Sequence, residues 1–286
     1  MEIKKVGVVG CGTMGSGIAQ VCAQSGYDVV VFEVSEEILK KGMSSIEFFM
    51  NKSVKKGKVT QKEKNSALAR IKGTTKYDDF GDCDLVVEAV IEEMGVKKKI
   101  FEALGEACPD RTILASNTSS LSIIDMASAT NRAEKVLGLH FMNPVPIMKL
   151  LEIVKSIATS MEVLAICKEF GKSLGKTVIV AKDTPGFIVN YLQYPFRLNA
   201  IRMLERGLAT KEEIDAAATL ALGHPMGPLA LQDLVGLDVT YKGALATYEA
   251  TGDPIFFPPV LMQKMIAAGW LGRKTGKGFY EYEKKS

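Results

Sequence analysis

The chain has 286 residues, a length that predicts one or two domains, each large enough to bury its own core. Its 36 Lys and Arg residues nearly balance 33 Asp and Glu residues, and the resulting formal charge of +3 argues against a nucleic-acid-binding or membrane-surface protein. Hydrophobic residues make up 47% of the chain, which argues against an intrinsically disordered protein.

Short apolar runs alternate with helical patterns in the first half of the chain. Residues 6–9 form a continuous apolar run, as expected of a strand buried on both faces, and residues 29–32 form another. Between them, residues 16–25 carry apolar side chains at helical spacing, and this strand–helix–strand order predicts a parallel sheet. Further strands are expected over residues 85–90, 112–115, 136–140, 150–154 and 177–181, and further helices over residues 96–107 and 162–174.

A lysine-rich helical hairpin is expected after the second strand. Residues 38–56 and 61–70 each show a helical pattern, and Gly57 marks the break between them. On pattern alone, its lysines form a solvated face of the hairpin. They are Lys52, Lys55, Lys56, Lys58, Lys62 and Lys64.

The sequence Asp183-Thr184-Pro185-Gly186 ends the alternating pattern, and no convincing strand follows it. Helices are expected over residues 187–206, 211–220, 228–247 and 258–268. We therefore predict an α/β domain over residues 1–184, built on a mainly parallel sheet with the inserted hairpin. An all-α domain is predicted over residues 185–286.

A glycine-rich loop directly follows the first predicted strand and opens the first predicted helix. Glycine suits its positions for backbone reasons: the first permits a tight turn, the second lets a pyrophosphate approach the main chain, and the third lets helix pack on strand. The helix N-terminus then offers N–H groups to the phosphates. In this context the loop is a dinucleotide-binding fingerprint of a Rossmann-like fold. Its candidate cofactor contacts are Gly10, Gly12, Thr13, Met14 and Gly15.

Glu33 ends the second predicted strand, close to the distance of about 20 residues from the glycines at which an acidic side chain hydrogen-bonds the ribose hydroxyls. Its charge repels a 2′-phosphate, so NAD is favoured over NADP as the cofactor. The alternative is a glycine-rich turn that binds no ligand, next to a solvated glutamate.

His140 and Glu152 are the candidate catalytic pair. His140 ends a predicted strand, and in open α/β sheets ligands lie at the carboxyl ends of strands. Glu152 is flanked by apolar residues in the next strand, where a buried carboxylate needs a partner such as a histidine. An imidazole oriented by a carboxylate is suited to moving a proton near neutral pH. On local pattern alone, a structural histidine and a strand-edge glutamate are equally compatible.

Two other polar motifs have structural interpretations. His224, one of 2 histidines in the chain, lies between predicted helices and is expected to shape a turn. The motif Asn117-Thr118-Ser119-Ser120 follows a predicted strand, where short hydroxyl side chains either cap the next helix or contact a substrate oxygen. The local pattern favours the helix cap.

The 5 cysteines are scattered and odd in number, and they form no CxxC pair. This distribution is typical of reduced thiols in a cytoplasmic protein, and it predicts neither a disulfide framework nor a metal site. The first residues lead into a strand pattern without signal-peptide features, and no apolar run approaches the ~20 residues needed to cross a bilayer. We therefore expect a cytoplasmic protein.

Further motifs follow the fingerprint in order along almost the whole chain. They are Ser-Asn-Thr-Ser-Ser at residues 116–120, His-Phe-Met-Asn-Pro at 140–144, Asp-Thr-Pro-Gly-Phe at 183–187, His-Pro-Met-Gly-Pro at 224–228 and Gly-Lys-Gly-Phe-Tyr at 276–280. Together these motifs resemble those of the 3-hydroxyacyl-CoA dehydrogenases, and among them the short bacterial 3-hydroxybutyryl-CoA dehydrogenases. The resemblance implies a Rossmann-like domain followed by a helical, dimer-forming domain.

The resemblance implies catalytic roles for residues at matching positions. His140 is the general base that takes the proton of the 3-hydroxyl group, and Glu152 orients it and stabilises its charged form. Ser119 hydrogen-bonds the substrate oxygen near the nicotinamide. Asn190 helps to hold the reacting carbonyl groups.

The resemblance also implies ligand contacts. The positions that contact NAD in the family are occupied here by Glu92, Lys97, Asn143 and Lys274. Lys56, with Lys52 one helical turn before it, matches a position that meets the phosphates of CoA, for which lysine is a suitable point charge. Two segments depart from the family pattern: residues 191–200, which follow Asn190, and Phe49, at a position that supplies a polar CoA contact.

The sequence therefore predicts the reversible oxidation of a (3S)-3-hydroxyacyl-CoA, such as 3-hydroxybutyryl-CoA, to the 3-oxoacyl-CoA with NAD. A dehydrogenase of a free hydroxy acid is one alternative, but it leaves the hairpin lysines without phosphates to bind. A nucleotide-binding protein without catalysis is another, and the presence of His140, Glu152, Ser119 and Asn190 argues against it. No metal, nucleic-acid or membrane partner is expected.

Overall fold

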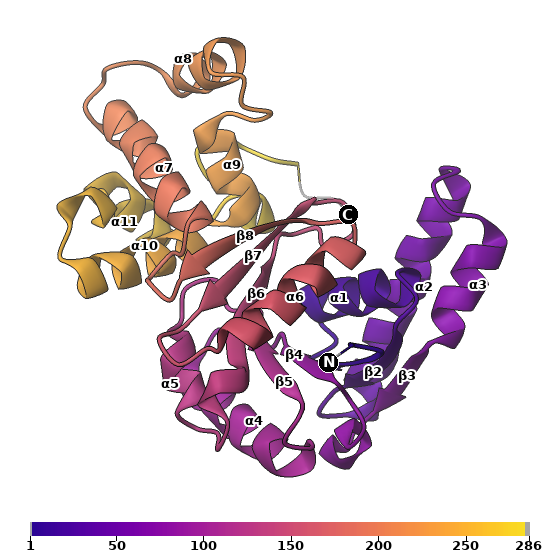
Figure 1. The fold of residues 1–286 in the computed structure, drawn as a ribbon. Coiled ribbons are helices and arrows are strands. Elements are labelled where there is room, and N and C mark those ends of the chain that lie inside the picture. The colour runs from indigo at the N-terminus through magenta and orange to yellow at the C-terminus, as the bar shows by residue number, and fades with distance from the viewer. Residues whose placement is uncertain (1, 284–286) are drawn as a thin grey trace. The chain divides into compact units, whose positions relative to one another are not determined.

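The computed structural model describes residues 2–283 and divides the chain into two compact units, Met1–Thr184 and Pro185–Ser286 (Figure 1). The first unit contains one sheet of eight strands, flanked by helices. The second unit is helical, apart from isolated bridges near its end. The predicted fold class, a mainly parallel α/β sheet followed by an all-α segment, is confirmed.

The sheet has the order β3-β2-β1-β4-β5-β6-β7-β8. All neighbouring strands in it are parallel except β6 and β7, which are antiparallel. The chain turns to opposite sides of β1 to form β2 and β4, and ligands of such sheets bind where the order reverses, at the carboxyl ends of the strands. The strands are β1 (Lys5–Val9), β2 (Asp28–Phe32), β3 (Ile71–Thr74), β4 (Leu85–Glu88), β5 (Ile113–Ser116), β6 (Val136–Phe141), β7 (Leu150–Lys155) and β8 (Thr177–Lys182).

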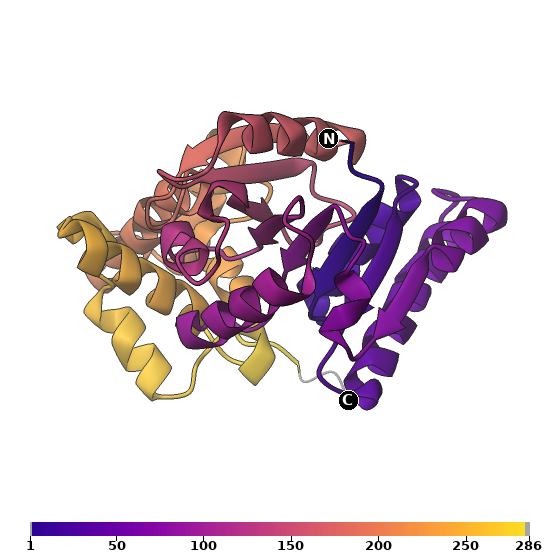
Figure 2. The same cartoon turned by 60° about the horizontal axis from the view of Figure 1, so that its bottom comes forward.

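Helices cover both faces of this sheet. Figure 2 shows α6 (Met161–Ser173) on one side of the strands and α4 (Met94–Ala107) on the other. α1 (Thr13–Gln24) shares the face of α6, and their apolar side chains join those of β1 in one core. The short helix α5 (Ile123–Ala127), which the sequence did not indicate, packs against α4 and β6.

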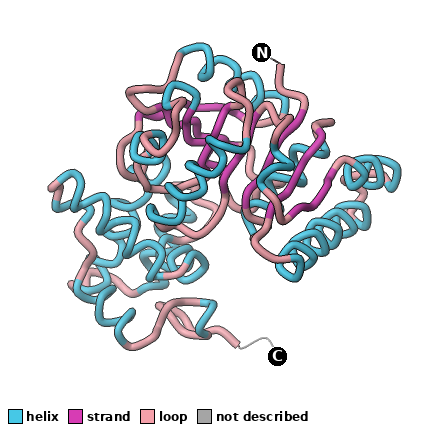
Figure 3. Tube along the Cα trace, turned by 90° about the horizontal axis from the view of Figure 1, so that it is seen from below, coloured by secondary structure: helices cyan, strands magenta, loops and turns pink. Residues whose placement is uncertain are grey.

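The predicted hairpin consists of α2 (Glu36–Lys55) and α3 (Gln61–Ala69), which lie side by side next to the edge of the sheet (Figure 3). Ser35 caps α2, and Thr60 and Glu63 form a capping box at the start of α3, which explains why both helices begin where they do. The edge strand β3 follows α3 and escaped prediction because only its two end residues, Ile71 and Thr74, are buried.

The second unit contains α7 (Val189–Glu205), α8 (Lys211–Ala216), α9 (Pro228–Val235), α10 (Leu237–Thr251) and α11 (Val260–Ala267). The predicted single helix over residues 228–247 is wrong, because Gly236 has a φ of 102° and separates α9 from α10. These helices enclose a separate apolar core that includes Leu198, Leu229 and Phe256. Within residues 2–283, no helix is long and apolar enough to cross a membrane.

Candidate active site

The predicted fingerprint loop joins β1 to α1 where the strand order reverses. Gly10 has a φ of 94°, a conformation that favours glycine, and its N–H donates to the Phe32 carbonyl at 2.9 Å. A Cβ atom on Gly15 would lie 1.8 Å from the Gly10 carbonyl oxygen. Only glycine therefore allows α1 to approach the loop this closely.

The N-terminus of α1 fits the pyrophosphate of a dinucleotide. Gly12 is the N-cap, and a Cβ atom built on it meets no atom within 4 Å, so this position opens away from the protein. The helix has no capping side chain and no acidic residue in its first turn, which contains Thr13 and Met14. Its first N–H groups have no intrahelical partner, and the helix dipole favours an anion there.

Glu33 directly follows β2, and its carboxylate is held beside the glycine loop. Its Oε2 atom accepts the Cys11 N–H at 2.9 Å, and its Oε1 atom accepts the Val34 N–H at 2.9 Å. Burial, followed by the charge of Glu33, raises the pKa of the Cys11 thiol to about 11. The carboxylate therefore lies beside the glycine loop, next to the end of β2.

His140 and Glu152 lie together on the neighbouring strands β6 and β7. They are register partners in the antiparallel β6–β7 pair, so their side chains share one face. His140 Nδ1 lies 2.8 Å from Glu152 Oε2, and the two residues are only 6% and 0% exposed. The predicted contact between them is therefore present, and His140 is the penultimate residue of β6, at its carboxyl end.

Asn117 and Lys176, for which the sequence predicted no such role, hold the segment after His140. Beyond the end of β5, Asn117 Oδ1 accepts the Phe141 N–H at 2.9 Å, as the backbone of a longer strand would. The buried Lys176 ammonium donates to the carbonyl oxygens of Val145 at 2.6 Å and Met148 at 2.7 Å. The loop that carries Asn143, whose side chain is exposed, is thereby fixed at both ends.

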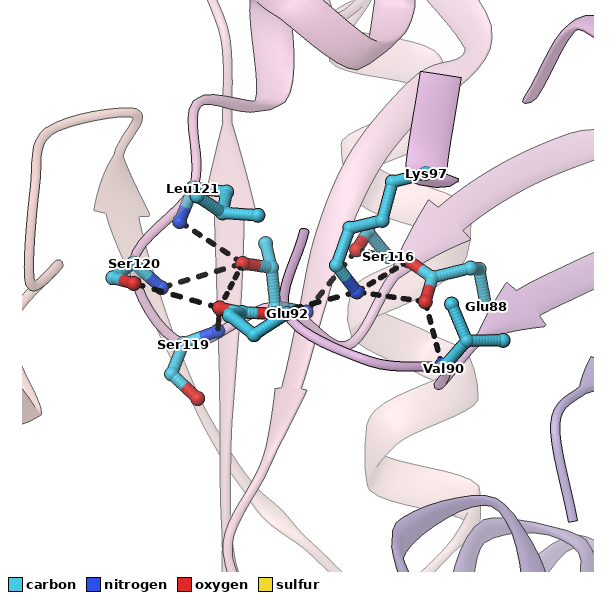
Figure 4. A network of polar contacts seen from close by, with 9 residues as sticks. Glu88, Val90, Glu92, Lys97, Ser116, Ser119, Ser120 and Leu121 are labelled. Atoms are coloured by element: carbon cyan, nitrogen blue, oxygen red, sulfur yellow. Dashed lines mark hydrogen bonds and ion pairs between the residues drawn. The ribbon is translucent and has the colours of Figure 1, made fainter. Parts of the chain in front are cut away.

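The predicted helix cap by the Asn117–Ser120 motif is wrong. Ser122 caps α5 through the Asp125 N–H, and Asp183 accepts the N–H groups of Ile123 and Ile124. The motif instead bonds to Glu92, whose Oε1 atom accepts the Thr118 hydroxyl at 2.6 Å and the Ser119 N–H at 2.8 Å. Figure 4 shows the Ser119 hydroxyl turned away from Glu92, toward the other side of the loop.

A buried ion pair, Lys97 with Glu88, is connected to this loop through Glu92. Lys97 Nζ lies 2.7 Å and 2.9 Å from the two carboxylate oxygens of Glu88, and these residues are 1% and 0% exposed (Figure 4). Lys97 also lies 3.3 Å from Glu92 Oε2, and the Ser116 hydroxyl donates to Glu88 at 2.6 Å. The ammonium of Lys97, a predicted NAD contact, thus belongs to a network of protein groups.

The hairpin lysines differ in their surroundings. Lys52 and Lys56 are exposed at the C-terminal end of α2, as expected of residues that meet a polyanion. Lys64 is buried and donates to Asn51 Oδ1 at 2.7 Å, so it holds α3 against α2 and adds nothing to a solvated face. Among residues 2–283, no group of three or more His, Cys, Asp or Glu side chains is arranged to hold a metal ion.

The remaining candidates lie in the second unit. Asn190 is half-buried in the first turn of α7. Lys274 is exposed and pairs with Asp238, at 2.6 Å and 2.7 Å from its two carboxylate oxygens. The His224 ring stacks on Phe196, with the ring centroids 4.7 Å apart, and the backbone N–H of His224 donates to the Ala218 carbonyl, in agreement with a structural role in a turn.

Two family models match the chain. The model of the 3-hydroxyacyl-CoA dehydrogenase NAD binding domain matches residues 5–184, and the model of the 3-hydroxyacyl-CoA dehydrogenase C-terminal domain matches residues 186–282. The chain belongs to the 3-hydroxyacyl-CoA dehydrogenase family. The predicted resemblance is thus confirmed, and NAD is the cofactor of this family's first domain.

Three relatives match this chain over almost the full length of both proteins. A 3-hydroxybutyryl-CoA dehydrogenase of Bradyrhizobium diazoefficiens is 47% identical over 98% of this chain and 96% of its own. The mitochondrial hydroxyacyl-coenzyme A dehydrogenase of the pig, Sus scrofa, is 44% identical over 98% of this chain and 92% of its own. The crystal structure of (S)-3-hydroxybutyryl-CoA dehydrogenase from Ralstonia eutropha has a TM-score of 0.97 at 44% identity, covering 99% of this chain and 100% of that one.

The residues that hold the site in place were not predicted from the sequence, although the sequence contained an indication of one of them. Glu88 interrupts an apolar strand, as Glu152 does, and a carboxylate in such a place needs a partner. The same argument that pointed from Glu152 to a histidine could therefore have pointed from Glu88 to Lys97. Asn117 and Lys176 carry no comparable signal, because their acceptors and donors are backbone groups distant in the sequence.

Proposed function

We propose that this 3-hydroxyacyl-CoA dehydrogenase oxidises a (3S)-3-hydroxyacyl-CoA, 3-hydroxybutyryl-CoA in particular, reversibly to the 3-oxoacyl-CoA with NAD. The observation that carries this proposal is the buried His140–Glu152 pair, 2.8 Å apart, at the carboxyl end of β6. The names of the relatives, which are 3-hydroxybutyryl-CoA and 3-hydroxyacyl-CoA dehydrogenases, supply the substrate class.

NAD, when bound, supplies the acceptor for the hydride that leaves C3 of the substrate. Gly10, Gly12 and Gly15 with the first turn of α1 hold its pyrophosphate, and Glu33 accepts its ribose hydroxyls. The negative charge of Glu33 disfavours the 2′-phosphate of NADP. At the family positions, Glu92, Asn143 and Lys274 add further contacts to the cofactor, and Lys97, whose buried ammonium bridges Glu88 and Glu92, holds Glu92 in place.

The chain's own part in the reaction is to move a proton. His140 Nδ1 is bound to Glu152, so the opposite ring nitrogen, Nε2, takes the proton of the 3-hydroxyl group as the C–O bond becomes a carbonyl. His140 is then an imidazolium ion, and the adjacent carboxylate of Glu152 lowers the free energy of that charged state. In the reverse direction His140 returns the proton to the carbonyl oxygen, so reduction is favoured at lower pH.

Other groups orient the substrate. Ser119 donates to the oxygen on C3, and Asn190 holds the carbonyl groups of the product. Lys52 and Lys56, both exposed at the end of α2, meet the phosphates of CoA as point charges. The helical unit forms a homodimer, which is supported by large exposed apolar side chains on it such as Leu192, Leu208 and Leu220. A cytoplasmic location is supported by 5 free, buried cysteines.

The test is steady-state reduction of acetoacetyl-CoA by NADH, compared with NADPH and with acyl chains of increasing length. Turnover of acetoacetyl-CoA with a preference for NADH supports the proposal. Free acetoacetate is the matched control, because it has the same reacting carbonyl and no CoA. Equal turnover of the free acid indicates a hydroxy-acid dehydrogenase, and NADH binding without turnover of any substrate indicates a protein without catalysis.

A further inference from the structure

The loop that carries Ser119 is held by a side chain with no proposed contact to substrate or cofactor. Thr118 is 1% exposed, and its hydroxyl donates to Glu92 Oε1 at 2.6 Å. The same hydroxyl accepts the N–H groups of Leu121 at 2.9 Å and Ser120 at 3.3 Å. A hydroxyl has one proton to donate and two lone pairs, so the hydrogen-bonding capacity of Thr118 is fully used.

The backbone of Thr118 is tied to the same network. Its N–H donates to Ser116 Oγ at 3.1 Å, and Ser116 in turn donates to the wholly buried Glu88. Glu92 is anchored to Glu88 as well, because Lys97 bridges the two carboxylates. Thr118 is therefore connected to the buried Glu88 in two ways: its N–H through Ser116, and its hydroxyl through Glu92 and Lys97. Thr118 lies directly before Ser119.

These contacts fix the direction in which the Ser119 side chain points. Its N–H donates to Glu92 Oε1 at 2.8 Å, the same atom that accepts the Thr118 hydroxyl, while its own hydroxyl points to the other side of the loop (Figure 4). A side chain on a loop reaches its reacting partner only if the backbone beneath it is held. Misplacement of a reacting group by 1 Å costs about 10²-fold in rate.

We propose that Thr118 is a positioning residue of this dehydrogenase: its hydroxyl locks Glu92 and the turn after it, and thereby aims Ser119 at the substrate oxygen. The inference rests on the proposed function, and on the part of Ser119 in it. Glu92 has two tasks in this arrangement, since a group expected to contact NAD also holds the loop of the residue that contacts the substrate. Thr118 acts through Ser119 and touches no reacting atom.

The experiment measures kcat and KM for acetoacetyl-CoA reduction, and the Kd of NADH, for wild type, Thr118→Val, Thr118→Ser, Ser119→Ala and the Thr118→Val/Ser119→Ala double variant. Valine keeps the shape of threonine and removes the hydroxyl. We expect it to lower kcat about tenfold or more, and to change the Kd of NADH by a smaller factor, because Glu92 keeps its ion pair with Lys97. Serine restores the hydroxyl and most of the rate.

The double variant separates positioning from general damage. If Thr118 acts through Ser119, Thr118→Val lowers kcat by less than about twofold once Ser119 is alanine. Thr112→Val is the matched control, because Thr112 is a buried threonine directly before β5 whose hydroxyl donates to the Cys83 carbonyl at 2.7 Å, away from this loop. It should leave kcat within about twofold of wild type.

The proposal is overturned if Thr118→Val lowers kcat by the same factor in both backgrounds, or if Thr112→Val lowers it as much. It is also overturned if Ser119→Ala has wild-type turnover, a result that leaves the proposed reaction intact. Absence of turnover by wild type contradicts the proposed function itself. Should Thr118→Val not fold, Ser116→Ala removes the acceptor of the Thr118 N–H and must show the same dependence on Ser119.

Discussion

Glu152 Oε2 lies 2.8 Å from His140 Nδ1 because the two residues are directly opposite each other in the antiparallel pair of β6 and β7. This is the one antiparallel pair among the strands of the sheet, and its register places both side chains on the same face. Both residues are nearly wholly buried, and a hydrogen bond to a charged group is stronger away from water. The pair is therefore the most specific feature of the proposed mechanism.

Replacing His140 with glutamine removes the proposed base and keeps a side chain of similar size. General acid–base groups contribute about 10²–10⁴-fold, so we expect kcat for acetoacetyl-CoA reduction to fall within that range. The control is His224→Gln, since His224 is exposed and stacks on Phe196 in the second unit. Turnover like that of wild type in the His140 variant would remove His140 from the mechanism.

Replacing Glu152 with glutamine tests the charge of the pair separately from its hydrogen bond. The amide still reaches the imidazole, but it no longer stabilises an imidazolium ion. We expect kcat to fall by about tenfold or more, because a charge-assisted hydrogen bond contributes about 1.5–3 kcal/mol. Initial rates with saturating NADH measure the loss, and circular dichroism checks the fold. A variant with unchanged kcat would show that Glu152 only orients the ring.

Two alanine variants separate the folding role of the fingerprint loop from its binding role. Gly12 has an ordinary φ of −72° and open space at its Cβ position, so Gly12→Ala should change the unfolding free energy by less than about 1 kcal/mol. Its methyl group occupies the place of the pyrophosphate, and NADH binding should be lost. Gly15→Ala forces a clash with the Gly10 carbonyl and should destabilise the fold by about 1–3 kcal/mol.

Thermal unfolding and NADH fluorescence titration check both variants. The informative outcome is their opposite behaviour: a stable protein that does not bind for Gly12→Ala, and a destabilised protein for Gly15→Ala. NADH binding of wild-type strength by Gly12→Ala would exclude the loop as the pyrophosphate site.

Glu33→Gln tests the cofactor preference. The carboxylate of Glu33 is oriented by the Cys11 and Val34 N–H groups, and glutamine keeps its size without its charge. We expect kcat/KM for NADH to fall about tenfold and the preference over NADPH to shrink, because charged acceptors bind hydroxyls more tightly than neutral ones. Asp28→Asn, at the opposite end of β2, is the control and should leave the ratio of kcat/KM for NADH to kcat/KM for NADPH unchanged. An unaltered ratio in Glu33→Gln would contradict the assignment of this residue to the ribose.

The parts of the site that were predictable from sequence are those whose residues are close in sequence or carry a physical anomaly. The glycines, the helix after them and Glu33 form one local strand–helix–strand unit. The contact of His140 with Glu152 followed from the cost of burying a carboxylate, without knowledge of the antiparallel register. The break at Gly236 was not predictable, because the helical spacing of apolar residues continues through it and only its φ of 102° shows the turn.

The network around Thr118 shows why other parts were out of reach. Its hydrogen bonds join β4, the loop after it, α4 and the β5–α5 loop, which come together only once the sheet has formed. Hydroxyl groups after a strand have several local partners, so the helix cap was a reasonable but wrong prediction. The structure replaces it with the more distant acceptor Glu92.

The five cysteines are expected to be unreactive in the folded protein. All are free and buried, and burial raises their pKa values, to about 11 for Cys11 and Cys108 and about 12 for Cys22, Cys83 and Cys167. The thiolate is the reactive form, so an aromatic disulfide reagent at pH 8 should label the native protein only as fast as it unfolds.

The raised pKa values of these thiols also make the stability of the folded protein depend on pH. An unfolded thiol ionises near its ordinary pKa of 9.0, whereas the folded thiols keep their protons to about pH 11 or above. A raised folded pKa stabilises the fold fully below pH 9, and this stability is lost as the pH rises from there through the folded value. Urea denaturation should therefore show a falling midpoint between pH 9 and 11, and Cys11→Ala should lessen the fall. Rapid labelling at pH 8 without unfolding would show that a thiol is accessible and contradict its burial.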